Sequence, residues 1–181
     1  NEKLTINEVN VYCGSYLPDW RGNVNFRKIY SAKKNMGGGV HLDLIHEIDY
    51  STWLFGQPME TYGFMTSTSS LNIDSTDYAQ YNLMYEKFVL NIKLNYFRRD
   101  TKREIEIVAE NETLLCDIQN CVIKNLTNGT ILFRKNYNIM DTYIAQMKYF
   151  FDIVKNCNQS MNSFEDSLKV LKIALNDKFT K

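Results

Sequence analysis

The sequence predicts an α+β fold, a two-layer arrangement in which helices pack on one face of a mixed or mostly antiparallel open sheet. Short segments with alternating apolar and polar residues follow one another through the middle of the chain, and consecutive short strands favour antiparallel pairing. Helix-like segments lie before and after this run. Because 181 residues are typical of one domain, we expect a single domain over residues 1–181. The other face of the sheet then needs cover from another domain or subunit.

The strands are predicted from alternation and from turn residues between the segments. Residues 88–97 form the longest one, because every second side chain from Phe88 to Tyr96 is apolar, which leaves one face buried. A first strand is expected at residues 4–12, and residues 67–77, rich in serine, threonine and asparagine, are expected to form a loop. The shorter candidates are residues 61–68, 103–109, 113–117, 121–124 and 130–134.

Three helices are predicted from the spacing of apolar residues. Residues 40–55 indicate a buried helix that Gly56 and Pro58 end, Ile139–Asn156 an amphipathic helix, and Ser163 caps a last helix. Stripes of apolar residues at this spacing are ordinarily core, so we expect both to be buried and to imply no cofactor. The two stripes are Met140, Tyr143, Ile144, Met147, Phe150, Phe151 and Val154, and Phe164, Leu168, Leu171 and Leu175.

The composition excludes several classes of function. Lysine plus arginine equals aspartate plus glutamate, 21 of each, so the net charge attracts neither nucleic acid nor a membrane surface. Four cysteines without CxxC spacing, distant from both histidines, indicate reduced thiols rather than zinc or disulfides. No segment resembles a membrane helix or a signal peptide, so we expect a soluble, cytoplasmic protein with a small-molecule partner. The start at Asn1, directly before a strand, suits a piece of a longer protein.

Both histidines lie in the segment of residues 37–50. Asp43 and His46 are three residues apart and would share one face of a helix, where the carboxylate can orient the imidazole. A histidine held in this way can act as a general acid or base near neutral pH. The alternative is a core histidine with Asp43 as its hydrogen-bond partner or as a helix cap, and chemistry alone favours it. His41 would lie on a different face and is expected to be structural.

Other chemistries find less support. A GxSxG elbow is absent and the cysteines have apolar neighbours, which argues against a hydrolase. Asp43, His46 and Asp49 are a possible set of metal ligands, but such sets are common on solvated helix faces, so we expect no metal. The glycines at 37–39 match neither GxGxxG nor a P-loop, although a chain segment or a ligand can approach them closely. NAD binding by this chain alone is therefore not expected.

Residues 30–56 resemble the signature of the Gfo/Idh/MocA oxidoreductases: a glycine run, Asp43, His46, Asp49 and then Trp-Leu-Phe-Gly. Residues 16–21, 95–99 and 104–114 and the final helix follow in the order that this family shows, so the resemblance covers nearly the entire chain. It implies the C-terminal, substrate-binding and oligomerisation domain of an NAD(P)-dependent oxidoreductase. The family acts on a hydroxyl carbon of a sugar, sugar derivative or cyclitol.

The resemblance also implies roles for single residues. His46 matches the catalytic histidine and Asp43 its aspartate, but only Leu44 and Ile45 separate them here, where commoner members have three residues, so their relative aim is open. Similarity to the sugar-modifying branch implies substrate contacts by aromatic faces and arginines, with packing as an equal alternative for each. These residues are Tyr16, Trp20, Arg21, Arg27 and Tyr30.

The family architecture implies partners as well. Members pair this kind of domain with an N-terminal Rossmann domain, which this chain does not contain and which binds most of the NAD or NADP. We therefore expect the isolated domain to hold no cofactor and to be inactive. The open sheet of family members commonly packs on another subunit, which implies a homo-oligomer. The competing interpretation is a noncatalytic carbohydrate-binding or assembly module with the same fold.

Overall fold

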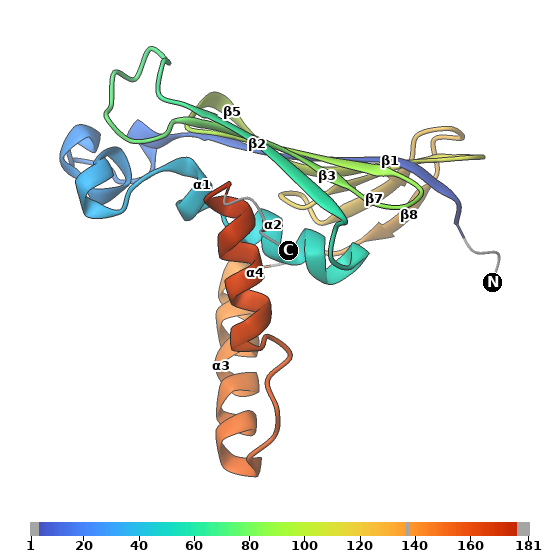
Figure 1. Cartoon of the computed structure of the whole chain (residues 1–181). Helices are drawn as coiled ribbons and strands as arrows, with labels where there is room; N and C mark the ends of the chain where they lie inside the picture. The colour runs from blue at the N-terminus through green and yellow to red at the C-terminus, as the bar shows by residue number, and fades with distance from the viewer. Residues whose placement is uncertain (1–3, 137, 177–181) are drawn as a thin grey trace.

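The architecture is one open sheet with helices on one of its faces. The structure is a computed structural model that describes residues 4–136 and 138–176. Eight strands lie in the order β2-β3-β4-β1-β5-β6-β7-β8 (Figure 1). Neighbouring strands are antiparallel except β1 and β4, which are parallel, so the predicted α+β fold is confirmed. The strands are β1 Ile6–Tyr16, β2 Glu60–Thr66, β3 Tyr78–Met84, β4 Val89–Asn95, β5 Phe97–Ala109, β6 Thr113–Asp117, β7 Val122–Asn125 and β8 Ile131–Arg134.

The core lies beneath the centre of the sheet. Leu90, Ile92 and Leu94 of β4 are fully buried, as the alternation predicts, and Val9 and Val11 of β1 are buried beside them. In the parallel register, Val9 pairs with Leu90 and Val11 with Ile92. The helices α1 Val40–Asp43 and α2 His46–Phe55 lie on this face, while α3 Ile139–Asn156 and much of α4 Phe164–Ala174 project away from it (Figure 1).

The predicted helix over residues 40–55 is divided, so the expectation of one continuous helix is wrong. Leu44, with φ −106° and ψ 24°, ends α1, and α2 begins at His46. At the break, the N–H of Ile45 donates to Leu42 O and that of Glu47 to Leu44 O, at 3.3 and 3.0 Å. These bonds span three residues instead of four and tighten the turn. The division removes the premise that Asp43 and His46 share one helix face.

α3 and α4 form a C-terminal helical hairpin, and both helices begin where the sequence predicts, at Ile139 and after the cap Ser163. Ser163 Oγ accepts from the N–H of Asp166 at 3.0 Å and caps α4. Near the other end of α4, the Tyr81 hydroxyl donates to Ala174 O at 2.7 Å and Asn176 Nδ2 donates to Gly63 O at 3.2 Å. These bonds attach the end of α4 to β2 and β3, where Ala174 is fully buried.

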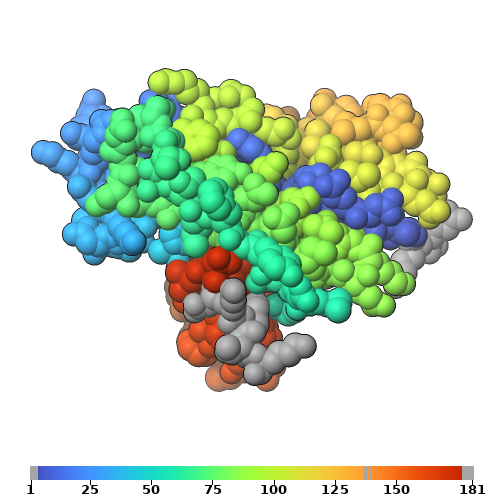
Figure 2. Space-filling model, turned by 45° about the horizontal axis from the view of Figure 1, so that its top comes forward, coloured from blue at the N-terminus to red at the C-terminus, as the bar shows by residue number. Residues whose placement is uncertain are grey.

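The two apolar stripes of this hairpin are exposed, so the expectation that they are core is wrong for this chain. The seven stripe residues of α3 are 50–61% exposed, and the four of α4 are 37–79% exposed. Burial needs a second surface, and only the end of α4, through Val170, Ile173 and Ala174, reaches one. The hairpin therefore projects from the body of the molecule and is joined to it at the end of α4 (Figures 1 and 2).

Candidate functional site

The segment between β1 and α1 is held at the end of β4. It forms the 3-10 turns Leu17–Asp19, Phe26–Lys28, Tyr30–Ala32 and Lys34–Met36. The N–H of the fully buried Leu17 donates to Tyr96 O at 2.8 Å. The Trp20 indole N–H donates to Ser15 Oγ at 2.8 Å, and its ring meets the Tyr96 ring edge-on, with centroids 5.3 Å apart. Trp20 is thereby fixed while part of its ring remains exposed.

A buried tyrosine connects this segment to Asp43. The hydroxyl of Tyr96 donates to Asp43 Oδ2 at 2.5 Å. Burial raises the pKa of Tyr96 far above its ordinary value, and the hydrogen bond to Asp43, the charge of Asp43 and the nearby Tyr30 act in the same direction. Tyr96 therefore remains a protonated donor and fixes the Asp43 carboxylate. Sequence reasoning assigned Tyr96 to the core alone, because it ends the apolar face of the predicted strand.

Two of the predicted substrate residues, Arg21 and Tyr30, lie next to each other, whereas Arg27 is engaged elsewhere. The Arg21 guanidinium carbon is 5.7 Å from the centre of the Tyr30 ring. The guanidinium of Arg27 stacks on the Phe26 ring at 4.5 Å and donates through Nη2 to Leu71 O at 2.9 Å. Arg27 therefore ties the segment to the loop over residues 67–77.

Tyr16 lies at the end of β1 and is paired with an arginine of β5. Its hydroxyl accepts from Arg99 Nη2 at 3.0 Å, and the Arg99 guanidinium carbon lies 4.1 Å from its ring centre. The structure thus connects Trp20 to the buried tyrosine that holds Asp43, whereas Arg21 and Tyr30 contact each other. Tyr16 and Arg27 have other partners, so the predicted set is only partly brought together.

The glycine run at residues 37–39 allows two segments of the chain to pack closely beside Asp43. A Cβ on Gly38 would lie 2.0 Å from Tyr30 O and 2.7 Å from Ser31 O, so only glycine fits there. Gly39, at φ 140°, leads into α1, and a Cβ there would lie 2.5 Å from the His41 ring. The close approach expected at these glycines is therefore made by segments of this same chain.

His46 is the first residue of α2, and its side chain is 47% exposed. Its Nε2 lies 3.1 Å from Oε1 of Glu47, whose side chain is fully buried. Within residues 4–136 and 138–176, no hydrogen bond or ion pair joins His46 to Asp43, and the Asp43 carboxylate is bonded to Tyr96 instead. The two predicted catalytic residues therefore have different partners on either side of the helix break.

Glu47 is the centre of a buried polar cluster. Its Oε1 lies 2.7 Å from Nη2 of Arg103 in β5, and its Oε2 accepts from the Tyr50 hydroxyl at 2.7 Å. Although burial lowers it, the pKa of Arg103 is raised overall by the charge of Glu47. Burial, with a contribution from Glu47, raises the pKa of the Cys13 thiol to about 12, which leaves that thiol protonated and unreactive. The sequence analysis did not identify Glu47 and Arg103 as functional candidates, because both occupy positions where a charged, solvent-exposed side chain fits the predicted helix and strand.

His41 is buried, in keeping with its expected structural role. It is 9% exposed, and its Nδ1 has no hydrogen-bond partner among the described residues. Burial lowers the pKa of His41, and the nearby charge of Asp43 opposes that shift. No group of three or more histidine, cysteine, aspartate or glutamate side chains in the described part of the chain is placed to hold a metal ion.

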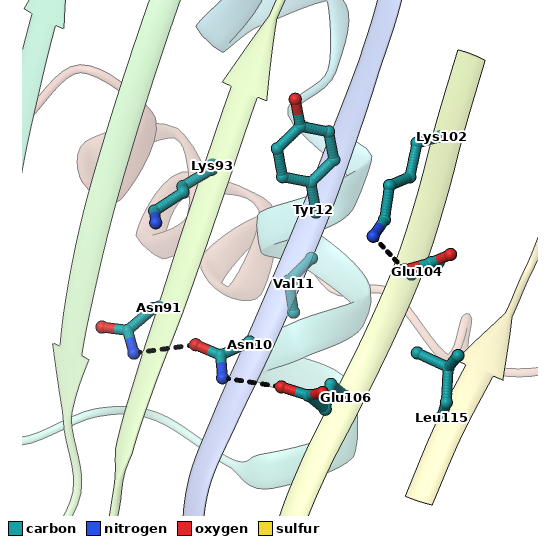
Figure 3. A pocket seen from close by; sticks show the side chains of 9 residues that line it. All are labelled: Asn10, Val11, Tyr12, Asn91, Lys93, Lys102, Glu104, Glu106 and Leu115. Atoms are coloured by element: carbon teal, nitrogen blue, oxygen red, sulfur yellow. Dashed lines mark hydrogen bonds and ion pairs between the residues drawn. The ribbon is translucent and has the colours of Figure 1, made fainter. Parts of the chain in front are cut away.

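The opposite face of the sheet carries a polar hollow of about 310 Å³. Its lining comes from β1, β4, β5 and β6, and its polar side chains lie on the face turned away from the helices (Figure 3). Asn91 Nδ2 donates to Asn10 Oδ1 at 3.0 Å, and Asn10 Nδ2 donates to Glu106 Oε2 at 3.1 Å. The Lys102 ammonium lies 2.6 Å from the Glu104 carboxylate. This part of the uncovered face is therefore polar and internally paired.

Comparison with known families identifies the domain. The model of the GFO/IDH/MocA C-terminal domain matches residues 5–115, which include the glycine run, Asp43, His46 and Tyr96. The chain belongs to this family. No curated protein sequence matches this GFO/IDH/MocA C-terminal domain at a significant level. As in the sequence analysis, this assigns the chain to a family of oxidoreductases. Among the described residues of the domain, no helix is long and apolar enough to cross a membrane.

Solved structures share the fold of this GFO/IDH/MocA C-terminal domain at low identity. UDP-N-acetylglucosamine 3-dehydrogenase GnnA from Acidithiobacillus ferrooxidans matches with a TM-score of 0.70 and 13% identity over 96% of this chain and 52% of its own. GenD2 from gentamicin A biosynthesis, in complex with NAD, matches with a TM-score of 0.72 and 15% identity over 96% and 53%. WlbA dehydrogenase from Bordetella pertussis, in complex with NADH and UDP-GlcNAcA, gives 0.65 and 16% over 94% and 50%. The chain spans about half the length of each.

Proposed function

We propose that this chain is the substrate-binding and catalytic half of an NAD(P)-dependent dehydrogenase that acts on a hydroxyl carbon of a sugar, sugar derivative or cyclitol. One observation carries the proposal. His46, the exposed one of the two histidines, begins α2 within the family match and contacts a buried carboxylate. Imidazole exchanges protons near neutral pH, so a histidine so placed suits general acid and base chemistry.

The proposed step of this chain is a proton transfer. When the alcohol is oxidised, His46 accepts the hydroxyl proton and becomes imidazolium, while the electrons of the O–H bond form the second bond of the carbonyl. Reduction runs the same transfer in the opposite direction. The nicotinamide supplies the acceptor or donor of the hydride on carbon. Asp43, fixed by Tyr96, contributes a carboxylate acceptor for a second hydroxyl of the substrate.

The glycine run of this chain does not fit the pyrophosphate of a dinucleotide. Backbone N–H groups hold such phosphates, but those of Gly37 and Gly38 already donate to Lys34 O at 3.1 Å and to Lys33 O at 2.9 Å. We therefore assign NAD or NADP binding to a nucleotide-binding domain of the whole protein and expect this chain alone to be inactive. All four cysteines are free thiols, which suits the cytoplasmic location that we propose.

The proposed substrate contacts follow the geometry of the turn segment. The exposed faces of Trp20 and Tyr30 suit stacking on a sugar ring, and Arg21 suits a carboxylate or phosphate of the substrate. Tyr16 and Arg27 keep their predicted role only if they exchange their present partners for substrate. Because GnnA and WlbA are named with nucleotide sugars, UDP-sugars belong in the substrate panel.

The test uses the protein that carries a nucleotide-binding domain together with this chain. We expect His46→Asn to lower kcat/KM by about 10²- to 10⁴-fold, because it removes the proton acceptor. His41→Asn is the matched control, and thermal melting checks that both variants fold. Turnover by His46→Asn at the wild-type rate would contradict the proposed role. If a sugar binds but no member of the panel is oxidised, the noncatalytic carbohydrate-binding module becomes the better interpretation.

We also propose that the chain forms a homo-oligomer through the open sheet face. The hydrogen-bonded row of Asn10, Asn91 and Glu106 offers polar groups to a second copy, so this interface would be hydrated. Size-exclusion chromatography with light scattering should give a dimer or larger species. A monomer mass that stays constant from dilute to concentrated samples would exclude the interface.

A further inference from the structure

A buried carboxylate lies directly beside the proposed catalytic histidine. Glu47 is fully buried, although glutamate is almost never buried without a partner. Its two oxygens have separate partners: Oε2 accepts from the Tyr50 hydroxyl at 2.7 Å, whereas Oε1 faces Arg103 at 2.7 Å and His46 Nε2 at 3.1 Å. The two oxygens are therefore open to separate tests by mutation.

Arg103 is the cationic partner of this carboxylate. It lies in β5 opposite Cys13 of β1, and its guanidinium crosses from the sheet to α2. Removing two charges from water costs free energy that an apolar pair of similar size does not cost. A buried ion pair is thus a poor way to fill this space, and its contact with an exposed imidazole suggests a use beyond packing.

The geometry of Oε1 shows where a further hydrogen bond fits. Oε1 is paired with Arg103 Nη2 at 2.7 Å, whereas its contact with His46 Nε2 at 3.1 Å is not aligned as a hydrogen bond. A carboxylate oxygen can accept more than one hydrogen bond, so Oε1 can take a second donor beside Arg103. The His46 ring, half exposed, can rotate to supply one, and catalytic hydrogen bonds are often poorly aligned until substrate binds.

We propose that Glu47 is the positioning residue of His46. Its Oε1 accepts the Nε2–H of the imidazole, which fixes the ring and its tautomer and leaves the Nδ1 lone pair free. Resting on the proposed function, Nδ1 is then the atom that takes the hydroxyl proton: the substrate O–H bond breaks and an Nδ1–H bond forms. The imidazolium that results faces the negative charge of Glu47, which stabilises it. Glu47 fills the orienting role that the sequence suggested for Asp43.

The experiment is NMR on the whole 181-residue chain with ¹⁵N-labelled histidine, at a pH where both imidazoles are neutral. The chain has two histidines, so His41→Asn assigns the signals. For wild type we expect His46 as the Nε2–H tautomer with an Hε2 signal protected from exchange with water. Glu47→Met should lose that protected signal, whereas Glu47→Gln, which keeps an acceptor oxygen, should retain it.

Tyr50→Phe separates positioning from a purely structural role. It removes the bond to Oε2 and leaves Oε1 in place, so the Hε2 signal of His46 should persist. Loss of the signal in Tyr50→Phe, or its persistence in Glu47→Met, would overturn the proposal. If Glu47→Met does not fold, the wild type still decides, because an Nδ1–H tautomer or an unprotected Hε2 there contradicts it. Wild-type turnover by His46→Asn would instead overturn the proposed function and leave this result standing.

Discussion

The sheet core and the C-terminal hairpin each have a regular apolar side, but that side is buried in the sheet and exposed in the hairpin. Leu90, Ile92 and Leu94 of β4 are fully buried, whereas the stripe of α3 is 50–61% exposed. Periodicity states which side of an element avoids water, and the rest of the chain decides whether that side is covered. The difference teaches that a stripe predicts a helix more safely than it predicts a core.

The largest expected effect on stability concerns the buried ion pair beneath the sheet. Arg103→Met should destabilise the chain by about 3–5 kcal/mol, because it leaves the buried Glu47 carboxylate without its cation. Lys102→Met is the matched control, since Lys102 has nearly the same side-chain exposure, 36% against 35%, but pairs with the partly exposed Glu104. The loss of unfolding free energy for Lys102→Met should be about 0–1 kcal/mol. Urea denaturation measures both, and equal losses would show that Glu47 does not need Arg103.

The same substitution in both regions tests the contrast directly. Ile92→Ala should cost about 2–5 kcal/mol of unfolding free energy, since Ile92 is fully buried. Ile144→Ala in α3, where the side chain is 50% exposed, should cost less than about 1 kcal/mol. Chemical denaturation of the isolated chain distinguishes the two. A loss of more than about 2 kcal/mol for Ile144→Ala would mean that the α3 stripe is covered in solution.

A third variant tests the joint between the regions. Tyr81→Phe removes the hydroxyl that donates to Ala174 O within the buried joint, so we expect a loss of about 1–3 kcal/mol. Hydrogen exchange should accelerate at the end of α4 more than in β4. The control is Tyr78→Phe, because the Tyr78 hydroxyl donates to the Gln80 side chain and not to a backbone carbonyl among the described residues. Uniform acceleration over the whole chain would instead place α4 within one cooperative unit with the sheet.

The smallest expected effect is a pH dependence of the unfolding free energy, which arises from the buried His41. Burial lowers the pKa of His41 below its ordinary 6.5, with Asp43 opposing the shift. Between the two pKa values the unfolded chain binds more protons, so stability should fall as the pH drops below about 6.5. Comparing denaturation of wild type and His41→Asn at pH 5 to 8 isolates the contribution of His41 to the pH dependence of stability. The same slope in both proteins would show that His41 does not contribute.

Much of the fold could be predicted from the sequence, where local patterns decide it. The bounds of α3 and β6 agree with the prediction because periodicity and turn residues define them. β3 was missed, since Ala79, Gln80 and Asn82 are poor strand formers, although every second residue is buried. The break at Leu44 was missed because the apolar spacing continues through it. Tertiary contacts override local patterns at such positions.

The candidate site could be predicted only as far as its motif extends. Asp43 and His46 follow from residues close together in the sequence, but their partners do not. Tyr96 lies 53 residues from Asp43, and Arg103 reaches Glu47 from another element. No local pattern encodes contacts of this range, so the partners became visible only when the sheet brought the segments together.

The position of β1 has a consequence for how the chain folds. β4 and β5 are separated only by Tyr96, yet they do not pair as a hairpin, because β1 lies between them with Val11 opposite both Ile92 and Ile105. Within this domain β1 is therefore made before both of its neighbours in the sheet, with β2 and β3 made in between. Loops of this length must close before any contact of the central strand forms, which slows folding. Until β5 is made, β1 lacks one of its two neighbours, so a nascent chain that ends before β5 leaves that edge of β1 open to aggregation.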